Sequence, residues 1–187
     1  VDHAAKTVSA EISGEAGTRS RITAVSIVGN ERTAEYIIRR KIAFEVGDMY
    51  SGSAIEQTVQ DLYLSGLFQR VELETKEAAP GELALTIQVT EGEAREISFL
   101  TGYGSYEQLR GGVFFTDRNL FGVGQTFRIG GKASLKSLGL DSTWTEPELF
   151  GTDNMLSVTG FWREREEPSF TDVSAGASVA ISRRLFA

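Results

Sequence analysis

Apolar and polar residues alternate along the segment 124–134, where Ile129 and Arg128 lie on opposite faces, and most clearly along 171–183. This period of two indicates a strand with one apolar and one polar side. The segment 107–116 alternates less regularly, because Phe114 falls among the polar positions. Short polar residues and glycines between the two segments predict a tight turn. Such a hairpin suits a membrane barrel with a wet lumen, and it equally suits a half-buried sheet of a soluble protein.

The N-terminal part of the chain carries helical periodicity instead. A strand over 22–30 is followed by Thr33, a candidate N-cap of a helix that runs to about Ile42. Ser53 and Glu56 have the capping-box spacing at the start of a second helix. Both segments place apolar residues at helical spacing, so we expect two amphipathic helices.

Two further alternating segments, 71–76 and 83–90, are predicted to be strands. The order β-α-α-β-β within residues 21–92 predicts a small α+β domain with two helices on one face of a three-stranded sheet. Residues 1–20 contain one more short alternating segment, which we interpret as the end of a preceding domain of the same kind.

Residues 93–187 contain strand patterns without a helix. Six segments are predicted, at about 96–105, 107–116, 124–134, 137–147, 154–164 and 171–183. Most approach the roughly 9–11 residues of a membrane-spanning strand, whereas strands of soluble proteins usually have about five or six. Glycine follows the same division, with 8 of the 20 glycines before residue 93 and 12 after it.

Composition excludes several classes of function. The net charge of −7 disfavours nucleic acid as a partner. The chain has no cysteine and one histidine, His3, so thiol chemistry and histidine-based catalysis are disfavoured. Asp117, Asn119 and Gly122 resemble the start of a calcium loop, but position 128 is Arg where that loop needs Glu. We therefore expect no catalytic residues, cofactor or metal, and we interpret this segment as a turn.

Several segments together resemble the BamA-like family of outer-membrane protein assembly factors. IVGNERTAEYIIRR, DLYLSGLFQRVEL and LTIQVTEGE are similar to the signatures of the family's POTRA domain. GYGSYEQLRGGVFFTDRNLFGVGQTFRI resembles its first three barrel strands, and TEPELFG the end of the fourth. The resemblance covers 21–187 and implies an α+β POTRA domain over 21–92. Antiparallel transmembrane β-barrel strands follow over 93–187, about six strands of an incomplete barrel. The family's later strands and inward loop have no counterpart here, so the chain is interpreted as a piece of such a protein.

The resemblance implies the assembly and insertion of outer-membrane β-barrel proteins, without covalent chemistry, so the protein is not expected to be an enzyme. The implied partners are unfolded outer-membrane proteins, periplasmic lipoproteins or chaperones of an assembly complex, and the lipid bilayer. The implied location is the bacterial outer membrane, with the N-terminal domain in the periplasm.

In POTRA domains the strand that corresponds to 71–76 lies at a sheet edge. The resemblance therefore implies that an extended client pairs with Val71, Glu72, Leu73, Glu74 and Thr75 by β-augmentation. The alternative is that a neighbouring domain covers this strand, or that its two glutamates guard an exposed edge.

The first barrel strand is implied to form one side of a seam that opens sideways. Its candidate residues are Ile97, Phe99, Gly102, Tyr103 and Gly104. Glycine weakens strand pairing, so the two glycines are expected to ease the opening. The free edge is then expected to template an incoming strand.

Three other functions stay open on the sequence. The first two are a POTRA-bearing two-partner secretion channel and a TamA-type translocation channel. The third is a soluble β-rich domain, an enzyme or a sugar-binding protein. Trp144 and Trp162 suit sugar binding, but aromatic residues near strand ends also suit a membrane interface.

Overall fold

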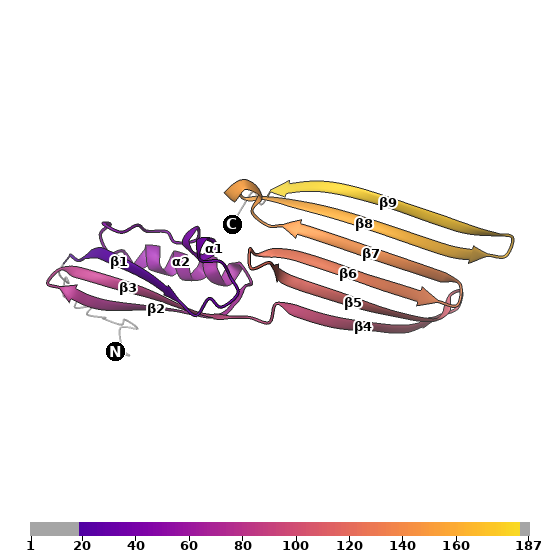
Figure 1. The fold of residues 1–187 in the computed structure, drawn as a ribbon, viewed down its shortest axis with the longest axis horizontal. Helices are drawn as coiled ribbons and strands as arrows, with labels where there is room; N and C mark the ends of the chain where they lie inside the picture. The colour runs from indigo at the N-terminus through magenta and orange to yellow at the C-terminus, as the bar shows by residue number, and fades with distance from the viewer. Residues whose placement is uncertain (1–18, 184–187) are drawn as a thin grey trace, which may run out of the picture.

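The structure is a computed structural model that describes residues 19–183. It contains a small α+β domain and a long antiparallel sheet, which lie end to end in Figure 1. The elements of the domain are β1 (Arg21–Val28), α1 (Glu35–Arg39), α2 (Gly52–Leu64), β2 (Phe68–Ala79) and β3 (Glu82–Glu91). The predicted strand within residues 7–12 and the interpretation of residues 1–20 concern residues 1–18, outside the described range.

The α+β domain has the predicted β-α-α-β-β order. Its strands are arranged β1-β3-β2, with β1 parallel and β2 antiparallel to the central β3. Figure 1 shows both helices on one face of this sheet. The core between the two layers includes five fully buried aliphatic residues, Ile22, Ile38, Leu62, Leu85 and Ile87. Burial of each such side chain contributes about 1.5–3 kcal/mol, so this layer stabilises the domain.

The two predicted helix caps are wrong. The N-cap of α1 is Ala34, and the hydroxyl of Thr33 is the acceptor of a hydrogen bond from Asn119 instead. The helix also ends at Arg39, before the predicted end near Ile42. Ser53 lies inside α2, whose N-cap is Ser51, and the two hydroxyls are hydrogen bonded to each other at 2.9 Å. The hydroxyls of Thr33 and Ser53 therefore bond other side chains and do not cap the two helices.

The second part is one antiparallel sheet in the strand order β4-β5-β6-β7-β8-β9. Its strands are β4 (Arg95–Gly104), β5 (Gln108–Leu120), β6 (Gln125–Ser134), β7 (Ser137–Glu146), β8 (Asn154–Glu167) and β9 (Phe170–Arg183). A short 3-10 helix, η1 (Leu149–Gly151), follows β7. All six predicted strands are confirmed, and each has 10 to 14 residues. In the described range the sheet does not close on itself, so β4 and β9 are its edges.

The register gives the sheet two chemically different faces, because directly paired residues share a face. One row across the strands is Phe99, Val113, Gly131, Leu140, Trp162 and Ala175. A row on the opposite face is Glu96, Thr116, Arg128, Thr143, Thr159 and Ser178. The first face is apolar and exposed, as at Phe99 with 75% of its surface accessible. A lipid-facing surface opposite a wet one has this composition.

Within residues 19–183, no helix is long and apolar enough to cross a membrane.

Candidate functional site

The first candidate surface is β2, an edge strand of the POTRA-like sheet. Val71 is buried in the core and Leu73 is half-buried, both on the helix side. Glu72, Glu74 and Thr75 are exposed. One face of β2 is therefore covered by helix, while its outer edge has no neighbouring strand in the described residues.

The second candidate surface is β4, an edge strand of the larger sheet. Ile97, Phe99 and Tyr103 lie on the apolar face with 61%, 75% and 76% of their surface accessible. Gly102 and Gly104 alternate with them and lie on the polar face. All five predicted residues thus belong to one open strand, although only the three large side chains reach the apolar surface.

Pairing along β4 is unbroken. Its residues pair with β5 in continuous register from Arg95↔Asp117 to Gly104↔Gln108. A Cβ atom added at Gly102 would come within 3.0 Å of the Arg110 Nε atom. Gly102 therefore leaves room for the Arg110 side chain. Glycine also weakens the strand itself, because it has a low β-strand propensity.

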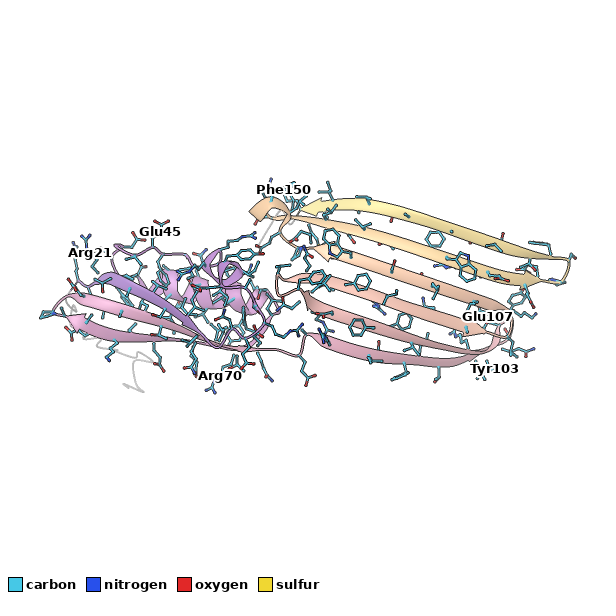
Figure 2. All side chains as sticks on the ribbon, viewed as in Figure 1. Arg21, Glu45, Arg70, Tyr103, Glu107 and Phe150 are labelled. Carbon is cyan, nitrogen blue, oxygen red and sulfur yellow. The ribbon has the colours of Figure 1, made fainter. Side chains whose placement is uncertain are left out.

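The far end of β4 is tied to the other side of the sheet. Tyr106, in the turn after β4, donates a hydrogen bond to the Glu167 carboxylate at the end of β8. This hydrogen bond raises the pKa of Tyr106. The Lys136 ammonium lies 4.3 Å from the centre of the same ring. In Figure 2, Tyr103 and Glu107 mark this end of the sheet, away from the α+β domain.

Phe114, the irregular residue of the sequence pattern, lies on the polar face and is buried. It pairs in register with Gly130, where an added Cβ would lie 2.1 Å from the ring. The Arg128 guanidinium lies 4.8 Å and the Lys132 ammonium 5.4 Å from the ring centre. The aromatic ring therefore fills the space above a glycine and is flanked by cations.

A third site, which the sequence did not reveal, is the joint between the two parts of the chain. The turn between β5 and β6 packs onto the α+β domain. Ala34 N–H donates to the Gly122 carbonyl at 2.9 Å, and Asn119 Nδ2 donates to the Thr33 hydroxyl at 2.9 Å. Val123 packs against the domain's hydrophobic core. A Cβ at Gly122 would lie 2.1 Å from the Arg32 carbonyl oxygen, so only glycine permits this approach.

Asp117 organises the charged part of the joint. Its buried carboxylate accepts hydrogen bonds from Arg95 Nε at 3.0 Å and from the Asn119 backbone N–H at 3.0 Å. The Arg32 guanidinium lies 3.6 Å away. One carboxylate thus contacts the α+β domain, the start of β4 and its own turn. The segment suspected as a calcium-loop start was interpreted as a turn, but Asp117 and Asn119 lie at the end of β5 and only Gly122 lies in the turn that follows; the two polar side chains are engaged in these contacts.

The last residue of β3 supports the same loop. The Glu91 carboxylate accepts hydrogen bonds from Arg32 N–H at 3.1 Å and from Thr33 N–H at 2.6 Å. These bonds hold the β1–α1 loop in the position where Asn119 reaches it.

A second contact between the two parts is ionic. Glu148, between β7 and η1, accepts from Arg40 at 2.8 Å and is paired with Lys41. Phe150, labelled in Figure 2, lies in this turn and is 94% accessible. The turn repeats the Leu-Phe-Gly sequence of the β5–β6 turn, and Phe121 and Phe150 both have a positive φ. The repeated Leu-Phe-Gly sequence is the signal from which the contact between the two parts of the chain could have been predicted.

The comparisons agree with this architecture. Residues 20–92 match the family model "POTRA: Surface antigen variable number repeat". An "Outer membrane protein assembly factor BamA" from Neorickettsia risticii is 28% identical over 170 residues, 88% of this chain and 23% of that protein. A relative with the same name from Buchnera aphidicola is 24% identical over 166 residues, 88% of this chain and 27% of that protein. The chain therefore spans about a quarter of the length of these curated relatives.

Two solved structures share the fold. BamA from Haemophilus ducreyi lacking POTRA domains 1-3 has a TM-score of 0.77 at 22% identity, covering 89% of this chain and 33% of that one. CdiB from Acinetobacter baumannii has a TM-score of 0.57 at 13% identity, covering 90% and 35%. The chain is thus a POTRA domain followed by antiparallel strands of an incomplete outer-membrane barrel. Residues 20–92 match the POTRA family, and most of the chain is similar to BamA outer-membrane protein assembly factors, which confirms the resemblance in the sequence.

Proposed function

We propose that this protein assembles and inserts outer-membrane β-barrel proteins, with β2 receiving an extended client segment and β4 templating a strand of the client. Its relatives carry the name of outer-membrane protein assembly factors, which supports the general part of the proposal. The partners are unfolded outer-membrane proteins, periplasmic lipoproteins or chaperones of an assembly complex, and the lipid bilayer. The POTRA domain lies in the periplasm and the strands lie in the bacterial outer membrane.

The observation that carries the proposal is the pair of open strand edges. β2 is an edge of the small sheet and β4 is an edge of the large one. In Figure 1 both run along the same lower margin of the molecule, and only the linker 92–94 separates the POTRA sheet from β4. An edge strand offers unpaired N–H and C=O groups that bind an extended chain without reading its sequence. Such recognition suits a receptor for many different clients.

The joint supports the same proposal. Asp117, Asn119 and Gly122 hold the POTRA domain against the end of β5 and the β5–β6 turn, so the two edges keep a defined relation. A client held on β2 would then be presented toward β4 in one orientation, which lowers the orientational cost of the second pairing step.

The test is disulfide trapping, which is simple here because the chain has no cysteine. The Phe99→Cys variant places a thiol on the β4 edge, and Ile129→Cys places one on the same face of interior strand β6. Glu74→Cys on β2 and Thr86→Cys on central β3, which are directly paired on one face, form the matching pair in the POTRA domain. The partner is an outer-membrane barrel protein stalled during assembly, with one cysteine in its terminal strand.

The proposal expects disulfides at positions 99 and 74, with at least about tenfold less at 129 and 86. Equal trapping at edge and interior positions, or no trapping at either edge, would overturn it.

A second candidate function is a POTRA-bearing secretion channel of the two-partner type. The fold likeness to CdiB, with a TM-score of 0.57, favours it. In that case a translocating polypeptide would pass the polar face. Cysteines such as Thr143→Cys on that face would then be trapped in preference to Phe99→Cys.

A further inference from the structure

The open edge of β2 is partly closed by a side chain of its own domain. The Val71 N–H donates a hydrogen bond to the Tyr63 hydroxyl at 3.1 Å. Val71 stands opposite Val89 of β3, yet its N–H reaches a side chain instead of the β3 backbone. That N–H therefore points away from β3, toward the edge where an added strand would bind.

The direction of the other backbone groups follows from the pairing. In an antiparallel pair, successive residues alternate between bonding their partner strand and pointing outward. Val71, Leu73 and Thr75 oppose Val89, Ile87 and Leu85 in regular register. Leu73 and Thr75 therefore present their N–H and C=O groups to the open edge in the same way as Val71.

Irregularities limit the usable length of this edge. The register of β2 shifts between Phe68 and Arg70, and again between Glu77 and Ala79. Such bulges twist a strand and interrupt regular pairing. The regular window is therefore 70–77, and the Tyr63 hydroxyl already occupies its first outward donor, the Val71 N–H.

The chain places Tyr63 there through the end of α2. The Gly66 N–H donates to the Tyr63 carbonyl at 3.0 Å, and Gly66 has a φ of 70°. This turn leads directly into β2, so the last turn of α2 lies beside the first residues of the strand. Tyr63 has 45% of its surface accessible, which leaves it open to an incoming chain.

The two sides of the window differ in polarity. Leu73 is half-buried on the helix side, whereas Glu72 and Glu74 are exposed on the other side. Residues on one face of an added strand would thus lie beside Leu73, and residues on its other face would lie beside the two glutamates. Strands of outer-membrane barrels alternate between apolar and polar residues and match this arrangement.

We propose that Tyr63 sets the register of strand addition on the POTRA domain, so that pairing with a client starts at Leu73 and excludes Val71. The proposal rests on the proposed function, because it assumes that β2 receives an extended segment. Tyr63 is a specificity-determining residue that acts through the Val71 N–H.

The test compares the wild-type chain with Tyr63→Phe in detergent micelles, with amide exchange of β2 followed by NMR. The control is Tyr50→Phe, a half-exposed tyrosine of the same domain whose backbone, not its hydroxyl, bonds Ser20. The probe is a synthetic peptide with the sequence of β9, residues 170–183, which has the alternation of a barrel strand. Exchange is recorded with and without the peptide.

Without peptide, Tyr63→Phe is expected to speed exchange at Val71 by about two- to tenfold, the effect of one lost hydrogen bond. With peptide, wild type and Tyr50→Phe should gain protection at Leu73 and Thr75 alone, and Tyr63→Phe should gain it at Val71 as well. Peptide-induced protection of Val71 in wild type, or one footprint in all three proteins, overturns the role of Tyr63 and leaves the proposed function standing. No protection of β2 in any of the proteins overturns strand addition itself.

Discussion

Asn119 shows how much a single residue contributes at the joint. Its side chain is buried, with the Nδ2 group donating to Thr33 and the Oδ1 atom accepting from the Gly124 N–H, each at 2.9 Å. One amide therefore closes its own turn and also binds the POTRA domain. Buried polar groups need such partners, because an unsatisfied one costs about 1–3 kcal/mol.

We predict that Asn119→Ala lowers the stability of the full chain by about 2–4 kcal/mol, because it leaves the Gly124 N–H and the Thr33 hydroxyl without their partner. The measurement is the thermal unfolding midpoint in detergent micelles. The control is Asn154→Ala, whose side chain bonds the nearby Thr152 and no other residue within 19–183, and which should change stability by less than about 1 kcal/mol. Equal shifts for the two variants would contradict the role of Asn119.

Phe114 and Gly130 are a second case in which one residue constrains another. The ring occupies the place that a Cβ at position 130 would need. We predict that Gly130→Ala destabilises the sheet by about 1–3 kcal/mol, the usual effect of overpacking. Heat-induced unfolding monitored by gel mobility measures it.

Two further variants separate crowding from a general effect of removing glycine. Gly111→Ala is the control, since its Cβ would meet the nearest atom at 3.7 Å, an ordinary contact. In the double variant Gly130→Ala with Phe114→Ala, the overpacking should disappear, so the two effects should not add. Additive losses would show that the ring does not need the glycine.

At the scale of elements, the two parts of the chain meet through two separate turns. The β5–β6 turn provides buried hydrogen bonds, and the turn after β7 provides the ionic contact of Glu148 with Arg40 and Lys41. Two points of contact restrict rotation about the linker more than one would. The orientation of the POTRA domain therefore depends on strands β5 to β7 as well as on the linker.

We predict a coupling energy of about 1 kcal/mol between Lys41 and Glu148 in a double-mutant cycle, because Lys41 is only 17% accessible. The coupling should fall when the ionic strength rises. The exposed pair Glu35–Arg39 within α1 is the control and should give about 0.3–0.5 kcal/mol. If the two pairs give the same energy, the ionic contact does not fasten the domains.

At the scale of the whole molecule, the two parts bury their apolar surface in different ways. The POTRA domain has a closed core, whose residues include Ile22, Leu62 and Ile87. The six-stranded sheet exposes large apolar residues such as Phe99 and Val179 along one face. A sheet of this kind needs lipid, detergent or a protein partner to cover that face.

We predict that residues 20–92 alone fold as a soluble monomer, whereas the full chain requires detergent or lipid. Phase partitioning in detergent and size-exclusion chromatography measure both properties. The isolated domain should lose about 1 kcal/mol or more, because Val123 no longer packs on its core. If the full chain is a cooperative, soluble monomer without detergent, the membrane assignment fails and a soluble binding domain becomes the better interpretation.

The sequence was most informative where the pattern is local. Alternation predicted all six strands of the sheet, and the β-α-α-β-β order of the POTRA domain followed from periodicity and turn residues. The helix caps at Thr33 and Ser53 were predicted wrongly for one reason. Both hydroxyls have side-chain partners, and the partner of Thr33 is 86 residues away.

The sequence by itself determined the type and approximate bounds of the strands and of the two α-helices, but not η1, because strand and helix periodicity depend on neighbouring residues. It also determined the two-faced character of the sheet. Only the tertiary structure decided how Asn119 meets Thr33, how Phe114 covers Gly130 and how Tyr63 reaches the edge of β2. Each of these contacts depends on the three-dimensional position of groups whose local sequence patterns carry no information about one another.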